Sequence, residues 1–365
     1  MGRTLSLLLA LAGGVAIAVQ ARITGALRTE LGDASLAATV TFGSGLVLML
    51  LVNGLVRANR RGVVRLVRGA VTGRFPWVFA FSGLLGAFAV YGQAVTVDLV
   101  GVALFSLVFI SGQMLSSTVM DTVGWVPSGR HRLSLRRSVG VLAGLAGVGL
   151  ALSPRLLGGG FGSGFGSGLG GGSGSGSGGD AAGPEMFLAL GLPLLLVLAG
   201  GLLQPPQMAM NAVMGAAVSR VEPLVLFNYL VGTLALLVVA APQIAAGGLA
   251  RLPWGPGDWW YYTGGLLGSV VVIGGALLTR TIGSLLFTLG LVAGQLAGSL
   301  VVDAVWPTRG AEVTWQVMTG AIVTLLALVL ASSSTLRSSL QNTRQDPPQN
   351  TRQDPVQPTR SETTP

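Results

Sequence analysis

Long apolar runs separated by short polar stretches dominate the chain. A helix needs about 20 mostly apolar residues to cross a bilayer, and lipid forces backbone polar groups to bond within the segment, which favours helices. The pattern predicts an all-α integral membrane protein with ten transmembrane helices. We interpret the first run as an uncleaved helix, since further spans follow it instead of a polar mature domain. The spans lie near residues 4–22, 34–56, 76–96, 100–120, 138–153, 186–208, 222–241, 259–278, 282–302 and 314–332.

Two stretches interrupt this pattern and define the domain organisation. Residues 154–185 are rich in glycine and serine, which is typical of a flexible linker. From residue 333 the chain is polar and repeats the heptad Gln-Asn-Thr-Arg-Gln-Asp-Pro, which is typical of a disordered tail. The prediction is a first five-helix repeat at 1–153, an extracytoplasmic linker at 154–185, a second five-helix repeat at 186–332 and a cytoplasmic tail at 333–365.

Composition supports the membrane interpretation and argues against a soluble enzyme. Of the 365 residues, 51% are hydrophobic and only 10% are charged, against roughly 25% charged in a soluble domain. The net charge of +9 comes from arginines in loops, with no basic stripe interleaved with aromatics, so we expect no nucleic acid partner. The positive-inside rule places two loops, and with them both termini, in the cytoplasm. Their arginines are Arg57, Arg60, Arg61, Arg65, Arg68 and Arg74 in one, and Arg130, Arg132, Arg136 and Arg137 in the other.

The two halves of the chain repeat each other. Because each copy holds five spans, an odd number, the copies must have opposite orientations in the membrane. Inverted repeats of this kind are typical of secondary transporters, which bind substrate at the repeat interface. The matching segments are Gly13-Gly14 and Gln20 with Gly200-Gly201 and Gln207, Phe42 and Gly45 with Tyr229 and Gly232, Gly83–Gly86 with Gly265–Gly268, Gly101 with Gly283, and Gly112–Asp121 with Gly294–Asp303.

Each half resembles the five-helix unit of the drug/metabolite transporter superfamily, specifically its YdcZ-like family of inner-membrane exporters. The resemblance is carried by Gln20, by Gly83–Ala87 after Pro76-Trp77, and by Gly112-Gln113 with Ser117, Asp121 and Gly124. The family's Gln-x3-Asn pattern is present as Gln207 and Asn211, whereas Thr24 replaces the Asn in the first half. The resemblance implies a ten-helix exporter fold in the inner membrane.

Polar side chains within the spans are the candidates for substrate binding, because they are costly in lipid. Gln113 and Gln295 each lie mid-span after a glycine, and an amide offers donors and an acceptor without a charge. Hydrogen bonding between helices is the alternative role. Further candidates are Gln20, Gln207, Asn211 and Gln93, and Pro205-Pro206 is predicted to interrupt the helix before Gln207.

Two aspartates near span ends, Asp121 and Asp303, are candidates for gating or structural roles. They either form gating pairs with loop arginines such as Arg130 or Arg309, or bond to backbone at a helix terminus.

These features predict a transporter that moves a small polar or amphipathic metabolite by alternating access. We expect no catalytic residue, cofactor or metal, since cysteine is absent and His131 is the only histidine. The expected partners are a small-molecule substrate and membrane lipids, with the chain acting as a monomer or homodimer. A lipid flippase or scramblase and a non-transporting scaffold are the alternatives, and an intramembrane enzyme is the least supported.

Overall fold

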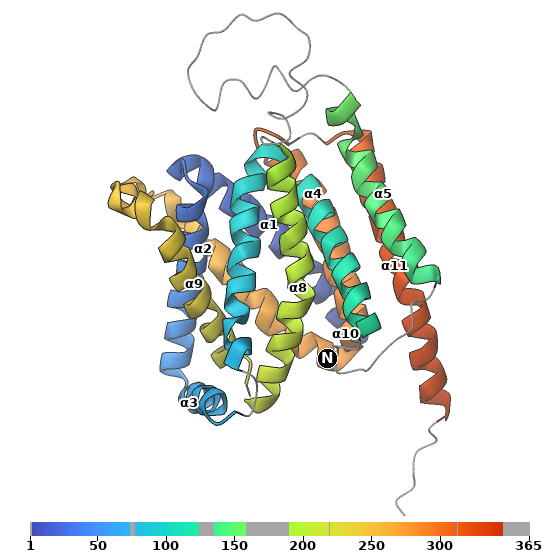
Figure 1. Ribbon diagram of the computed structural model, residues 1–365, viewed down its shortest axis with the longest axis horizontal. Coiled ribbons are helices and arrows are strands. Elements are labelled where there is room, and N and C mark those ends of the chain that lie inside the picture. The colour runs from blue at the N-terminus through green and yellow to red at the C-terminus, as the bar shows by residue number, and fades with distance from the viewer. Residues whose placement is uncertain are drawn as a thin grey trace, which may run out of the picture.

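The protein is a bundle of long helices (Figure 1). The computed structural model describes residues 2–73, 77–123, 135–157, 190–218, 220–311 and 313–345, and regular secondary structure in these segments is entirely helical. The α-helices are α1 (Arg3–Leu31), α2 (Ala34–Leu55), α3 (Arg57–Val71), α4 (Ser82–Val123), α5 (Leu135–Leu157), α8 (Leu192–Ala217), α9 (Glu222–Ala245), α10 (Gly264–Val305) and α11 (Trp315–Gln345). Short 3-10 helices are η1 (Trp77–Phe81), η3 (Gly248–Arg251) and η4 (Asp258–Thr263).

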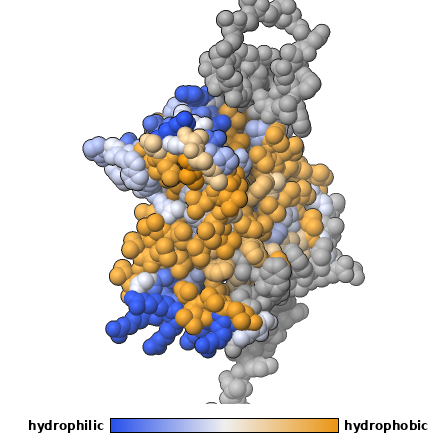
Figure 2. Space-filling view, turned by 60° about the vertical axis from the view of Figure 1, so that its left-hand side comes forward, coloured by the Kyte–Doolittle hydropathy of each residue, from blue (hydrophilic) through white to orange (hydrophobic). Residues whose placement is uncertain are grey.

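The helices form a membrane-spanning body. Within the described residues, seven helices are long and apolar enough to cross a membrane: Thr4–Leu31, Ala34–Leu55, Ser82–Met120, Leu192–Gly215, Glu222–Ala245, Asp258–Thr279 and Leu286–Val305. Ser138–Ser153 and Trp315–Leu330 are shorter apolar helices. Figure 2 shows a broad hydrophobic band between two more hydrophilic ends. The chain is therefore an all-helical membrane protein, as predicted.

Two of the longest helices are each divided at one glycine. Gly101 in α4 has φ 86° and ψ 166°, and Gly283 in α10 has φ 79° and ψ 157°. Glycine adopts this left-handed backbone without the steric penalty of other residues. The two kinks lie at equivalent positions of the sequence repeat. Figure 1 shows one part of α4 on each side of α8.

Helix crossings repeat in the same way. The carbonyl oxygen of Leu11 in α1 lies where a Cβ atom would be if Gly294 in α10 were a larger residue. The equivalent carbonyl of Leu198 in α8 lies 2.5 Å from the Cβ position of Gly112 in α4. The first helix of each half therefore packs directly against the kinked helix of the other half. A residue larger than glycine at either of these two positions would force the helices apart.

Several predicted boundaries need correction. α1 continues to Leu31 instead of ending near residue 22, because Gly32 and the N-cap carboxylate of Asp33 place the turn there. The stretch after α2, predicted as a loop, contains the helix α3. Pro205 and Pro206 lie inside a continuous α8, which packs against both parts of α4. α5 and α11 extend to Leu157 and Gln345, and most of the predicted linker and tail lies outside the described residues.

Candidate functional site

Two aromatic rings mark one place where the two halves meet, between α2 and α9. Phe42 of α2 and Tyr229 of α9 pack edge to face, with ring centroids 5.2 Å apart. Each ring fills the space beside a glycine of the opposite helix, Tyr229 beside Gly45 and Phe42 beside Gly232. Since residues 42 and 45 correspond to 229 and 232 in the repeat, the contact is reciprocal, as across a two-fold axis.

A pair of polar side chains lies on each side of these rings. The hydroxyls of Thr24 and Thr41 are 3.4 Å apart between α1 and α2. At the equivalent positions between α8 and α9, the Asn228 amide donates to Asn211 Oδ1 at 3.1 Å. Both threonines are fully buried, whereas both asparagines are half-buried. The two halves therefore place equivalent polar groups in different surroundings.

Gln20 and Gln207 are two further polar side chains, and each lies over a glycine of a kinked helix. The Cβ position of Gly268 is 3.1 Å from Gln20 Oε1 and 2.8 Å from the Tyr229 hydroxyl. The Cβ position of Gly86 is 2.6 Å from Gln207 Nε2. Both glutamines are half-buried. We use the name polar layer for the residues Gln20, Thr24, Thr41, Tyr229, Gln207, Asn211 and Asn228.

Three residues of this layer, Gln20, Gln207 and Asn211, were predicted from the sequence as site residues, whereas Thr41, Asn228 and Tyr229 were not. A signal was present, because Thr41 and Asn228 occupy equivalent positions of the repeat and are both polar. Ser82 was also missed, and its hydroxyl donates to Asn228 Oδ1 at 2.7 Å.

The other predicted glutamines lie elsewhere. Gln295 is 3% exposed, and its Nε2 donates to Ser106 Oγ at 3.5 Å, across from α10 to α4. This hydrogen bond joins two helices. Hydrogen bonding between helices was the role named as the alternative to substrate binding. Gln113 is half-buried on α4. Gln93 is 7% exposed, and its Nε2 has no hydrogen-bond partner among the described residues.

Asp303 fastens the end of α10 to the kink in α4. Its Oδ1 accepts from Val102 N at 2.9 Å and its Oδ2 from Ala103 N at 2.7 Å, so it caps the second part of α4. The carboxylate bonds the backbone of a distant helix, which extends the predicted structural role beyond local backbone. The side chain of Asp121, its repeat equivalent, lies outside the described residues, as does Arg130.

A buried arginine completes this end of the bundle. Arg22 is 8% exposed, and its Nε donates to the Trp306 carbonyl at 2.8 Å. Its Nη2 donates to the Pro307 carbonyl at 3.3 Å, and its guanidinium lies 4.4 Å from the centroid of the Trp306 ring. Thr308 donates to Val97 O and Gly310 N donates to Asp98 O, so the segment after α10 is bound to the chain just before Gly101.

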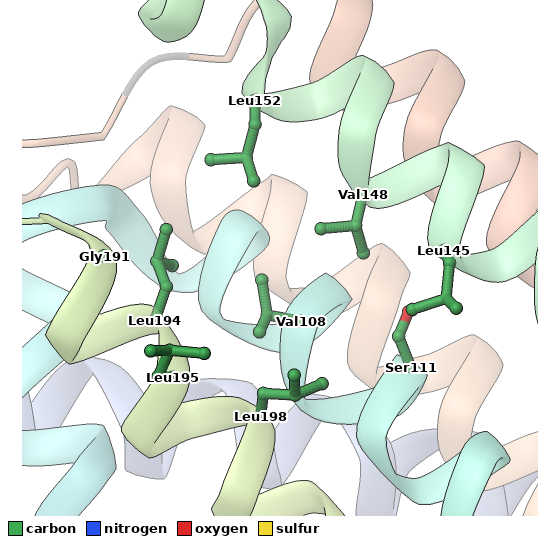
Figure 3. Close-up of a pocket in the computed structure, with 9 residues that line it drawn as sticks. All are labelled: Val108, Ser111, Leu145, Val148, Leu152, Gly191, Leu194, Leu195 and Leu198. Atoms are coloured by element: carbon green, nitrogen blue, oxygen red, sulfur yellow. The ribbon is translucent and has the colours of Figure 1, made fainter. Parts of the chain in front are cut away.

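The structure also contains an apolar groove of about 280 Å³ between α4, α5 and α8. Figure 3 shows the side chains that point into it, and Ser111 is the one with a polar group. The lining is Val108, Ser111, Leu145, Val148, Leu152, Gly191, Leu194, Leu195 and Leu198. The lining is therefore apolar except for Ser111. Among the described residues, no group of three or more His, Asp or Glu side chains is placed to hold a metal.

Comparison with known proteins agrees with this architecture. The sequence profile of the family "Putative inner membrane exporter, YdcZ" matches residues 5–150 and again residues 192–330. The chain belongs to this family. The two matched regions coincide with the two repeats of the sequence, so the chain carries the family's unit twice. No curated protein matches the chain.

Proposed function

We propose that this member of the YdcZ family is a secondary transporter that moves a small, uncharged polar or amphipathic solute by alternating access. We infer ten membrane crossings from the helices. Dividing the span Ser82–Met120 at Gly101 turns seven long spans into eight, and the two shorter apolar helices bring the number to ten. Five crossings in each repeat give the repeats opposite orientations, which is typical of alternating-access carriers.

The observation that carries the proposal is the polar layer with its unequal halves. Alternating access requires two equivalent sets of contacts, one closed while the other is open. Thr24 and Thr41 form the closed set and are buried, whereas Asn211 and Asn228 occupy the equivalent positions and are half-buried. Exchange of these two surroundings between the repeats would carry a solute bound at the layer from one side to the other.

The substrate class follows from the chemistry of the layer. Its members offer amides and hydroxyls, which bind neutral hydrogen-bonding groups without the cost of a buried charge. Gln93 lies outside the layer, and its Nε2, unpaired among the described residues, makes it a separate candidate for substrate contact. We assign a role in packing to Gln295, because of its contact with Ser106, and leave Gln113 as a candidate for substrate contact.

The direction of transport and the membrane are inferred from the family, and the orientation of the chain in that membrane is inferred from its arginines. The family is one of inner membrane exporters, and the positive-inside rule places α3, and with it both termini, on the cytoplasmic side. The proposal requires no cofactor or catalytic residue, and one chain contains both repeats.

Counterflow in proteoliposomes tests the proposal. The purified chain would be preloaded in turn with neutral polar solutes, amino acids, organic cations and organic acids. Saturable exchange is expected for a neutral or zwitterionic solute. Gln207→Leu should abolish this exchange, while Gln243→Leu, at an exposed position near the end of α9, should leave it unchanged. Both variants would be checked for monodispersity by size exclusion.

Two results would refute the proposal. Equal exchange by folded Gln207→Leu and Gln243→Leu would show that the polar layer does not bind the solute. Exchange of no solute in the panel, together with rapid scrambling of a fluorescent phospholipid in the same vesicles, would make the protein a lipid scramblase.

A further inference from the structure

The helix α3 has three distinct faces. Asn59, Gly62, Leu66 and Gly69 are buried and form the face toward the protein. Val64, Val67 and Val71 follow one another at spacings of three and four, so they share a second face, and they are 57%, 49% and 82% exposed. A third face carries Arg57, Arg61, Arg65 and Arg68, all exposed. The remaining arginine of α3, Arg60, precedes Val64 by four residues on the valine face, and its Nε donates to Gly54 O at 2.6 Å.

The buried face fixes α3 to the turn between α8 and α9. Leu66 packs with Met214, Val218 and Leu224 in one cluster. A Cβ on Gly62 would lie 2.6 Å from Pro223 Cγ, so glycine permits the close approach. In Figure 1, α3 is seen nearly end-on while α2 and α9 run the length of the bundle, so its axis lies across one end. Figure 2 shows a hydrophilic patch at that end, next to the hydrophobic band.

This geometry specifies what the exposed faces contact. A valine stripe left in water would be unfavourable, whereas beside an arginine stripe at the edge of the hydrophobic band it meets the boundary between hydrocarbon and headgroups. Arginine binds phosphate oxygens with paired N–H donors. Four arginines on one face give a charge that is complementary to anionic headgroups.

We propose that α3 is an anionic-phospholipid site, with its valines in the acyl-chain boundary and its arginines on headgroup phosphates. The site belongs to one leaflet. The corresponding connection of the second repeat, between α9 and α10, has the short helix η3 with Arg251 in place of an amphipathic helix. Lipid bound at α3 would hold the turn between α8 and α9, the two helices that carry Asn211 and Asn228.

Fluorescence quenching by brominated lipids tests this proposal on the full chain, because the absence of native cysteine allows a single label. Val71→Cys would carry an environment-sensitive fluorophore on α3, and Val238→Cys, 76% exposed on α9, would carry it in the spanning region. Vesicles would contain equal fractions of phosphatidylglycerol and phosphatidylcholine, with one or the other brominated in its acyl chains. The label at residue 238 should be quenched equally by both lipids, and the label at 71 more strongly by brominated phosphatidylglycerol.

Charge variants then separate the site from net charge. Because each basic residue near an anionic surface strengthens lipid binding, Arg57→Gln, Arg61→Gln and Arg68→Gln together should weaken the preference by roughly a hundredfold, which abolishes it. The control removes the same charge from the tail, with Arg344→Gln, Arg352→Gln and Arg360→Gln, and should retain the preference. Inorganic phosphate at millimolar concentration should not compete.

Four outcomes would overturn the proposal. Absence of quenching at residue 71 by either lipid would place α3 outside the membrane interface. Equal quenching of the label at residue 71 by both lipids would show that α3 has no headgroup preference. An equal loss of that preference in the tail variant would show that it depends only on the net charge of the chain. Competition by inorganic phosphate would make α3 a site for the free anion instead of the lipid.

Discussion

The carboxylate of Asp303 connects two helices that are distant in sequence, and its replacement by asparagine measures the strength of that connection. In the folded protein its two oxygens each accept one backbone N–H, at 2.9 Å from Val102 and 2.7 Å from Ala103. The side chain is only 4% exposed. Asp303→Asn preserves the shape but leaves one oxygen, so one N–H faces an NH2 group and has no acceptor there.

The expected loss is large for an isosteric change. Hydrogen bonds to charged groups contribute about 1.5–3 kcal/mol each, and leaving a buried donor unpaired costs about 1–3 kcal/mol. Because one bond is lost and the other becomes neutral, we expect Asp303→Asn to reduce the free energy of unfolding by about 2–4 kcal/mol.

Asp33→Asn provides the matched control. Asp33 also caps a helix and accepts the Leu36 N–H at 2.9 Å, but it does so within its own turn at a partly exposed position. Asparagine is as good an N-cap as aspartate, so this change should cost a few tenths of a kcal/mol. Thermal unfolding of both variants in the same detergent compares them directly. An unfolding temperature for Asp303→Asn no lower than that of Asp33→Asn would refute the bidentate cap.

Three further predictions follow from the packing and from the arginines. Gly294→Ala should abolish the folded, monodisperse fraction in size exclusion, because its methyl group would overlap the Leu11 carbonyl, whereas Gly149→Ala, with open space around it, should not. Tyr229→Phe should lower stability by about 1 kcal/mol, seen as a lower thermal midpoint, since its hydroxyl donates to Gly265 O at 3.0 Å; an unchanged midpoint would contradict this bond. In whole cells an impermeant thiol reagent should label Leu249→Cys but label Arg61→Cys only after permeabilisation, and the reverse pattern would overturn the orientation.

Much of the architecture could be predicted from the repeat. Alignment of the two halves pairs Gly101 with Gly283 from the sequence alone, and both glycines have the same kinked backbone. The same alignment pairs Phe42 with Tyr229. Repetition specifies which residues are equivalent, but not which of them touch. The way in which the two halves pack together decides these contacts. It places Phe42 beside Gly232 and Tyr229 beside Gly45.

The interhelical contacts of Gln295 and Asp303 show the limit of sequence reasoning more sharply. A mid-span glutamine is compatible with substrate binding and with helix packing, and the sequence does not show that Gln295 lies next to Ser106 on α4. Asp303 was expected near a helix terminus, which is correct, but the terminus it caps belongs to α4, in the first half of the chain.

The helix α3 was missed for a different reason. Its arginines dominate the composition of the segment and favour a solvated loop, while the buried positions Asn59, Gly62, Leu66 and Gly69 carry only one large apolar side chain. Spacings of three and four among the buried positions and among the valines were the available signal. Two glycines on the buried face give no hydrophobic signal, because they act by close approach.

The same close approach explains why the two repeats form one folding unit. In a chain of independent domains, each half would bury its own core and meet the other through a modest interface. Here the first helix of each half packs against the kinked helix of the other half, at glycines beside which no side chain fits. Separation of the halves would therefore expose backbone as well as side chains, and lipid offers that backbone no alternative partner. The close crossings at Gly112 and Gly294 join the repeats, so the proposed exchange of surroundings at the polar layer would have to pivot about these crossings.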